Sequence, residues 1–85
     1  FGGSEAENLA QQGAHAYWNK KYDLAFKNFK KACELGSGEG CAYLGMAYED
    51  GISVKKDPSK AADYYQKACK LGSKQSCENY SKLKK

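Results

Sequence analysis

Four cysteines are the residues of this chain whose type and spacing most readily support chemistry. Cys33 and Cys41 lie eight positions apart, and Cys69 and Cys77 repeat that spacing. Structural zinc sites use cysteines separated by about two to four residues, and thiol redox catalysts use a Cys-x-x-Cys pair. Because neither pattern is present, we expect disulfides, no metal and no cofactor. Disulfides persist in oxidising compartments, so the cysteines predict a periplasmic or secreted protein.

Two further groups of residues are of types that could act in catalysis. His15 is the single histidine, and no serine or cysteine is tied to it by a known motif, so we interpret it as a polar residue near a helix surface. Glu49 and Asp50 are neighbours, and adjacent helical residues do not face each other. They are more typical of a solvated helix end than of an acid–base couple. A second interpretation is an acidic spot on a binding face.

Composition disfavours two classes of partner. The 85 residues carry 14 basic and 10 acidic side chains, a formal charge of +4, and every basic one is a lysine. Arginine, which best contacts phosphates and base edges, is missing, so we expect no nucleic-acid partner. No apolar run reaches membrane-spanning length, so we expect no membrane insertion. Phe1-Gly2-Gly3 is interpreted as a mature start after removal of an export signal, or as an artificial boundary.

Helix-start and helix-stop signals show which elements must position these residues. Ser4 and Glu7 form a capping-box pattern, and Asp57 precedes a proline as a helix cap. Glycines at 36 and 72 suit left-handed helix ends, and each is followed by a serine that can cap the next helix. These signals predict helices over about 5–19, 23–35, 38–50, 58–71 and 74–84.

Two glycines fall inside the predicted helices. Gly13 and Gly45 each cost about 1 kcal/mol relative to alanine in a helix interior. The physical reason that we infer is close approach of another helix.

A shift of 36 residues aligns the chain with itself. It pairs Lys31-Ala32-Cys33 with Lys67-Ala68-Cys69 and Cys41 with Cys77. Self-similarity at this period is typical of a solenoid of helical hairpins. The predicted fold class is therefore all-α.

Individual positions resemble two related repeat families. Residues 9–32 resemble a tetratricopeptide repeat at Leu9, Gly13, Tyr22, Ala25, Phe29 and Ala32. Residues 41–68 resemble its Sel1-like variant, which has a longer loop, at Leu44, Gly45, Tyr48, Gly51, Val54, Asp57, Lys60, Ala61, Tyr65, Lys67 and Ala68. Ser53 stands where that loop usually has a second glycine. With a cysteine after each Lys-Ala and another eight positions on, the chain is similar to the Helicobacter cysteine-rich protein family.

The resemblance implies a disulfide pairing and a domain organisation. Each cysteine pair in that family clamps two antiparallel helices, which implies Cys33–Cys41 and Cys69–Cys77. A tight hairpin also brings such positions within disulfide range. The implied fold is a right-handed α-α solenoid of about two hairpins. It comprises a tail at 1–4, a tetratricopeptide-like repeat over 5–37, a Sel1-like repeat over 38–73 and a capping helix over 74–85.

Relatives in this family are often labelled β-lactamases, which would require a catalytic serine. Ser53 and Ser81 each begin the letters S-x-x-K, but both lie in lysine-rich stretches. Serine β-lactamases also need a Ser-Asp-Asn-type element and a Lys-Thr-Gly-type strand, and neither is present. We therefore predict no catalytic residues, and we keep β-lactam binding or hydrolysis as an alternative function.

The leading hypothesis is a secreted or periplasmic module that binds a protein or peptide. In tetratricopeptide repeats the first helix of each hairpin lines the concave side, and that resemblance implies a ligand-facing surface here. Tyr17, Trp18 and Met46 would serve as apolar anchors with acidic residues nearby, which suits a basic or extended peptide. We expect a monomer, and a cap fragment of a longer solenoid remains a further alternative. The predicted ligand-facing surface consists of Glu7, Tyr17, Trp18, Glu39, Met46, Glu49, Asp50 and Lys82.

Overall fold

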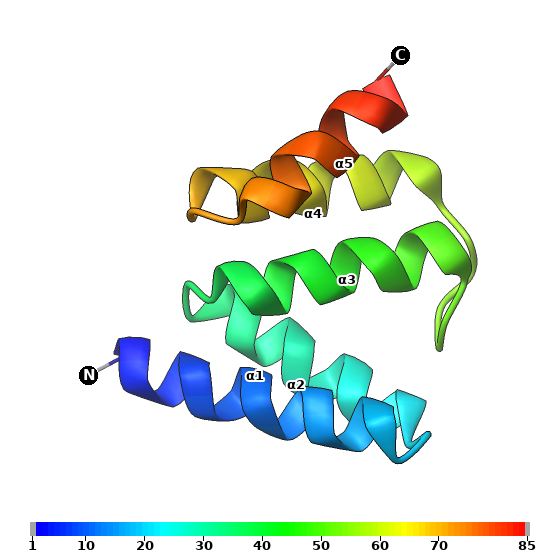
Figure 1. Ribbon diagram of the computed structural model, residues 1–85. Coiled ribbons are helices and arrows are strands. Elements are labelled where there is room, and N and C mark those ends of the chain that lie inside the picture. The colour runs from blue at the N-terminus through cyan, green and yellow to red at the C-terminus, as the bar shows by residue number, and fades with distance from the viewer. Residues whose placement is uncertain (1, 85) are drawn as a thin grey trace.

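The computed structural model describes the backbone of residues 2–84 and the side chains of residues 5–83. Within this part of the chain every regular element is a helix. Figure 1 shows consecutive helices running back and forth, so that the third follows the direction of the first. The predicted all-α solenoid is confirmed. Its elements are α1 (Gly2–Trp18), α2 (Tyr22–Glu34), α3 (Gly38–Asp50), α4 (Pro58–Lys70) and α5 (Lys74–Lys84).

The first helix begins earlier than its capping-box pattern predicts. α1 starts at Gly2, so residues 2–4 are helical where we expected a tail, and Ser4 lies inside the helix. The side chain of Ser4, on which the predicted capping contact depends, lies outside the described side chains. A cap contributes only about 1 kcal/mol, so it does not prevent a helix from extending past it.

The other predicted helix boundaries have the expected contacts. The Ser37 hydroxyl accepts a hydrogen bond from the Gly40 backbone N–H at 2.9 Å, and the Asp57 carboxylate accepts one from the Lys60 N–H at 3.1 Å. Gly36 closes α2 with φ 99°. These contacts satisfy backbone donors that a helix start leaves free, and they allow connections short enough for tight hairpins.

The glycines inside α1 and α3 lie where two helices approach closely. A Cβ atom added at Gly13 would lie 2.7 Å from the Phe29 ring, and one at Gly45 would lie 2.6 Å from the Tyr65 ring. The predicted reason for both glycines is therefore confirmed: each leaves room for an aromatic ring of the following helix.

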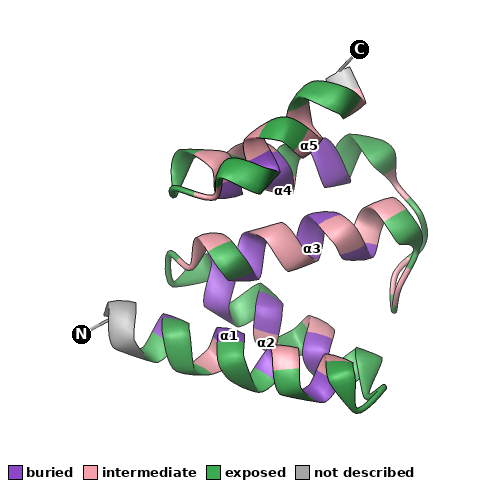
Figure 2. Ribbon diagram, in the orientation of Figure 1, coloured by how far each residue is buried: buried purple, intermediate pink, exposed green. Residues whose placement is uncertain are grey.

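The core is a thin layer of small side chains around a few large ones. Figure 2 shows the buried positions of α2 and α3 facing the neighbouring helices, while much of α1 and α5 is exposed. Phe29 and Leu44 are the large side chains of the main cluster, and alanines and cysteines fill the rest. The cluster joins three consecutive helices and reaches α4 through Ala68. Its buried members are Ala16, Ala25, Phe29, Cys33, Cys41, Leu44 and Ala68.

Two disulfides tie the ends of consecutive helices. Cys33 bonds Cys41 across the α2–α3 junction, and Cys69 bonds Cys77 across the α4–α5 junction, with Cα–Cα distances of 4.6 and 4.7 Å. All four cysteines of the chain are thereby oxidised. Oxidised structural cysteines indicate an extracytoplasmic protein. Among the described residues, none of the helices has both the length and the apolar character needed to cross a bilayer.

Candidate functional site

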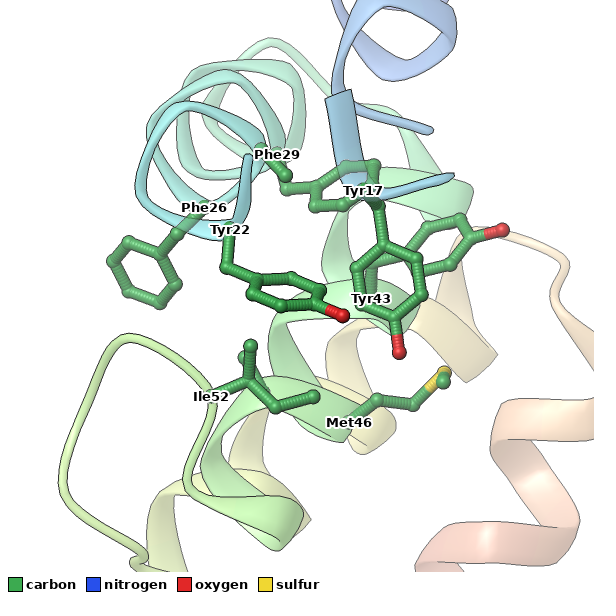
Figure 3. Close-up of a pocket in the computed structure, with 9 residues that line it drawn as sticks. Tyr17, Tyr22, Phe26, Phe29, Tyr43, Met46 and Ile52 are labelled. Carbon is green, nitrogen blue, oxygen red and sulfur yellow. The ribbon is translucent and has the colours of Figure 1, made fainter. Parts of the chain in front are cut away.

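A small apolar cavity opens between α1, α2 and α3, next to the loop after α3 (Figure 3). Its volume is about 10 Å³, which is too small for a side chain to enter. A ligand would therefore lie over its aromatic walls without filling it. The walls are Tyr17, Tyr22, Ala25, Phe26, Phe29, Tyr43, Met46, Ala47 and Ile52.

Ring contacts fix the geometry of the cavity walls. Phe29 and Tyr43 stack with centroids 4.3 Å apart, and Tyr17 meets Tyr22 edge to face at 5.3 Å. Tyr17 also lies 6.1 Å from Tyr43, so it connects the rings of α2 and α3. Such pairs add about 0.5–1.5 kcal/mol beyond the area they bury. We define these four residues as the aromatic cluster.

Trp18 lies at the edge of the aromatic cluster. Its ring meets the Tyr17 ring edge to face at 5.8 Å, yet 75% of the residue is exposed to solvent. Exposed aromatic side chains on a rigid surface are the usual anchors of protein partners. Trp18 is the most exposed large hydrophobic residue among the described side chains.

Burial and nearby carboxylates raise the pKa of two tyrosines, Tyr43 in the aromatic cluster and Tyr65 on α4. Burial raises the pKa of Tyr43, and the negative charge of Glu39 raises it further. Burial also raises the pKa of Tyr65 strongly, helped by a hydrogen bond from its hydroxyl to the Glu49 carboxylate at 2.7 Å and by the charge of Asp50. Both hydroxyls therefore remain protonated well into the alkaline range, and Glu49 is engaged in a structural contact.

The structure brings together only part of the predicted face. Tyr17 and Met46 lie in the same cavity wall, with Trp18 in contact with Tyr17. The other predicted members do not line this cavity: Glu49 is half-buried against Tyr65, and the rest are exposed on α1, α3 and α5, namely Glu7, Glu39, Asp50 and Lys82.

Tyr22, Tyr43 and Ile52 line the cavity although the predicted face did not include them. The repeat resemblance gives Tyr22 a place in internal packing, leaves Tyr43 open between packing and contact with a partner, and puts Ile52 in a loop. The available signal was Ile52 itself, which with Val54 is one of two apolar residues in the connection after Gly51. In Figure 3 Ile52 lies below the Tyr22 ring, and its side chain extends toward Met46.

The residues considered for catalysis have other surroundings. His15 is exposed, with a ring nitrogen 3.3 Å from the Asn19 amide. The Ser53 hydroxyl donates a hydrogen bond to the Asp23 carboxylate at 2.7 Å on an exposed surface. Ser81 is also exposed, on α5. None of these three residues lines the cavity between α1, α2 and α3.

The Sel1 repeat family model matches residues 11–37 and 38–73, which together form most of the chain. Beta-lactamase HcpA of Helicobacter pylori strain J99 is 38% identical over 60 residues, covering 71% of this chain and 24% of the relative. "Putative beta-lactamase HcpE" of the same strain is 46% identical over 55 residues, covering 65% of this chain and 16% of the relative. The chain therefore spans about a quarter or less of these relatives.

"Putative beta-lactamase HcpC" of Helicobacter pylori strain 26695 is 41% identical over 52 residues, covering 61% of this chain and 18% of that relative. The two repeat matches meet between Ser37 and Gly38, at the α2–α3 junction that the first disulfide closes. The repeat matches, the paired cysteines and these relatives agree with one another, and the chain belongs to the Sel1 repeat family, in its Helicobacter cysteine-rich type.

Proposed function

We propose that this chain is a disulfide-stabilised module, periplasmic or secreted, that binds a protein or peptide through the surface around the aromatic cluster. The observation that carries the proposal is the exposure of Trp18, at 75%, beside ordered tyrosine rings. An exposed tryptophan offers a large contact area with few rotatable bonds, so ordering it costs a partner little entropy.

The surface is preorganised for binding. Stacked rings hold Tyr43 against Phe29, and the Cys33–Cys41 disulfide fixes α2 relative to α3. A surface that is ordered before binding loses little conformational entropy when a partner arrives. Met46 adds an adaptable apolar side chain to the same wall, which suits contact with varied partner side chains.

Alanine variants test the proposal directly. Linear peptides selected from a displayed random library would be titrated by calorimetry against Tyr17→Ala, Trp18→Ala and Met46→Ala. We expect at least one of these variants to weaken binding by about tenfold or more, because an anchor side chain that the partner covers contributes much of the binding free energy. Leu24→Ala is the matched control, because Leu24 is a large apolar residue on α2, 48% exposed and outside the cavity walls. Unchanged affinity in all three variants would refute the proposed surface.

The names of the relatives raise a competing function, β-lactam hydrolysis. Incubation with a chromogenic cephalosporin separates the two. We expect no turnover, because Ser53 donates its hydroxyl hydrogen to Asp23 on an exposed surface that offers no enclosed oxyanion site. Turnover that a single serine substitution abolishes would favour the enzyme.

A further inference from the structure

The two disulfides occupy equivalent places in the repeats but differ in their access to solvent. Cys33 and Cys41 are 1% and 0% exposed, whereas Cys69 and Cys77 are half-buried. A thiolate breaks a disulfide by attacking one of its sulfur atoms, so access decides which bond reacts first. Small thiols can therefore reach the Cys69–Cys77 bond in the folded protein, but they reach the Cys33–Cys41 bond only when the core opens.

The helix that the second disulfide holds has little other attachment. A shift of 36 residues aligns α5 with α3, and the five buried positions of α3 can be compared directly. Among the described side chains of α5, the one buried residue at these positions is Ser76, whose hydroxyl accepts a hydrogen bond from the Ser73 hydroxyl at 2.8 Å. The pairs, with α3 first, are Gly40 with Ser76, Cys41 with Cys77, Leu44 with Tyr80, Gly45 with Ser81 and Ala47 with Leu83.

The neighbours of α5 differ from those of α3 as well. α3 packs against both α2 and α4, whereas α5 packs chiefly against α4 (Figure 1). Tyr80 and Leu83 are half-buried and lie beside Ala62 of α4, where the three residues line the same open hollow. α5 has 11 residues, and an isolated helix of this length is marginal in water. The helical state of α5 therefore depends on its attachment to α4.

We propose that the Cys69–Cys77 disulfide is a redox-sensitive switch. Its reduction by an external thiol frees α5 from α4, while the Cys33–Cys41 disulfide keeps α2 and α3 joined. Freeing α5 exposes the side of α4 beside Tyr80 and Leu83, including Ala62, which is 8% exposed in the oxidised protein. The switch does not rest on the proposed function, because the aromatic cluster lies on α1, α2 and α3.

The reaction is a thiol–disulfide exchange with two external thiols as the reductant. The first attacks one sulfur of the Cys69–Cys77 pair as a thiolate, the S–S bond breaks, and a mixed disulfide forms. The other cysteine leaves as a thiolate and takes up a proton. The second external thiol then attacks the mixed disulfide. Two external thiols are thereby oxidised to one disulfide, and the protein disulfide is reduced to two cysteine thiols.

Reduction by glutathione tests the order in which the disulfides react. The folded, oxidised protein would be incubated with reduced glutathione, alkylated with N-ethylmaleimide, digested with trypsin and measured by mass spectrometry. An intact Cys69–Cys77 bond joins the tryptic peptides 68–70 and 75–82, whereas Cys33 and Cys41 lie within one peptide, 32–55. We expect Cys69–Cys77 to be reduced at least about tenfold faster than Cys33–Cys41. Equal rates, or earlier labelling of peptide 32–55, would overturn the inference.

Hydrogen exchange tests whether α5 is freed. The Cys69→Ala/Cys77→Ala variant removes the bond without a reductant, and the partly reduced wild-type protein should behave in the same way. We expect the amides of α5 to exchange at least about tenfold faster than in the oxidised protein, and those of α2 and α3 to keep their rates. Unchanged exchange in α5 would overturn the switch, because packing alone would then hold the helix. Faster exchange throughout the chain would also overturn it, since the bond would then hold the whole fold.

Reversal provides the matched control. Oxidised glutathione should restore slow exchange in α5 of the reduced wild-type protein, because the two cysteines can form their bond again. The same treatment should leave the Cys69→Ala/Cys77→Ala variant unchanged. A reduced wild-type protein that does not recover would contradict a reversible switch.

Discussion

Gly13 in α1 and Gly45 in α3 occupy matching places, and each faces one aromatic ring from the helix that follows. The first ring is Phe29, and the second is Tyr65. Four residues after its glycine, α1 carries Tyr17 and α3 carries Glu49. In the first repeat the ring beside the glycine has no polar group and Tyr17 lines the cavity, whereas in the second the buried Tyr65 hydroxyl donates a hydrogen bond to the Glu49 carboxylate.

The two repeats share the same arrangement of a glycine facing a ring, but the residues around it make different contacts. Where the helix pair holds Tyr17 and Phe29, the rings stay available as cavity walls. In the second repeat, the Tyr65 hydroxyl donates a hydrogen bond to the Glu49 carboxylate, and Tyr65 is almost fully buried. The cavity walls come from both repeats, with Tyr17 and Phe29 from the first and Tyr43 and Met46 from the second, whereas the Glu49–Tyr65 pair is a structural contact inside the second.

The two disulfides differ in burial, and their removal has the largest expected effect. Cys33 and Cys41 are fully buried, whereas Cys69 and Cys77 are half-buried. The chain-entropy model gives about 2.5 kcal/mol for closing either small loop. Cys33→Ala/Cys41→Ala also leaves a cavity in the core, so we expect a loss of about 3–5 kcal/mol. Cys69→Ala/Cys77→Ala should cost about 2–3 kcal/mol. Urea unfolding followed by circular dichroism measures both, and equal losses would contradict the assigned difference in packing.

The glycine–ring contacts come next in size. Gly13→Ala and Gly45→Ala each place a methyl group under 3 Å from a ring that is almost fully buried. We expect each to destabilise by about 1–3 kcal/mol, despite the helix preference of alanine. Gly38→Ala is the milder control, because its Cβ would first meet the Leu71 Cβ at 3.3 Å. Thermal melts compare the three, and a stabilised Gly45→Ala variant would show that the ring moves freely.

Tyr65→Phe makes the second repeat resemble the first and has the smallest expected effect. Near neutral pH it removes one hydrogen bond to a carboxylate, so we expect a loss of about 1 kcal/mol.

Its pH dependence is the sharper test. Burial and Glu49 raise the pKa of Tyr65 above the ordinary value of about 10, so the folded protein keeps a proton that the unfolded chain has lost. The contribution of Tyr65 to stability is therefore fully present below about pH 10 and is lost as pH rises through the alkaline range. Tyr65→Phe should fall less steeply there, as measured by urea unfolding at pH 8 to 11. Identical slopes would contradict the cited pKa shift.

Much of this fold follows from the sequence, because its signals are local. Caps, closing glycines and the 36-residue period depend on neighbours in the chain. They located the boundaries of α2 to α5 to within a residue or so, and the helix-end cysteines placed both disulfides. The start of α1 was wrong, because a capping pattern states a preference worth about 1 kcal/mol and not a boundary.

The site was less accessible to sequence reasoning, because its contacts join distant residues. Glu49 pairs with Tyr65 across 16 positions, and the choice of partner depends on how deeply the hydroxyl is buried. From the sequence we expected Glu49 to be an unpaired acid on the ligand-facing surface. Likewise, repeat positions alone gave Tyr22 a packing role, although it is exposed and lines the cavity.

The loop after α3 belongs structurally to the repeat before its own. Ile52 lines the cavity between α3 and the first repeat, and Ser53, with φ 64°, donates a hydrogen bond to Asp23 at the start of α2. A gene duplication that copied residues 38–73 alone would inherit a loop whose partners are encoded upstream. The cavity wall is therefore a property of the junction between neighbouring repeats, and a single copied repeat would keep it only beside an upstream neighbour that supplies the same contacts.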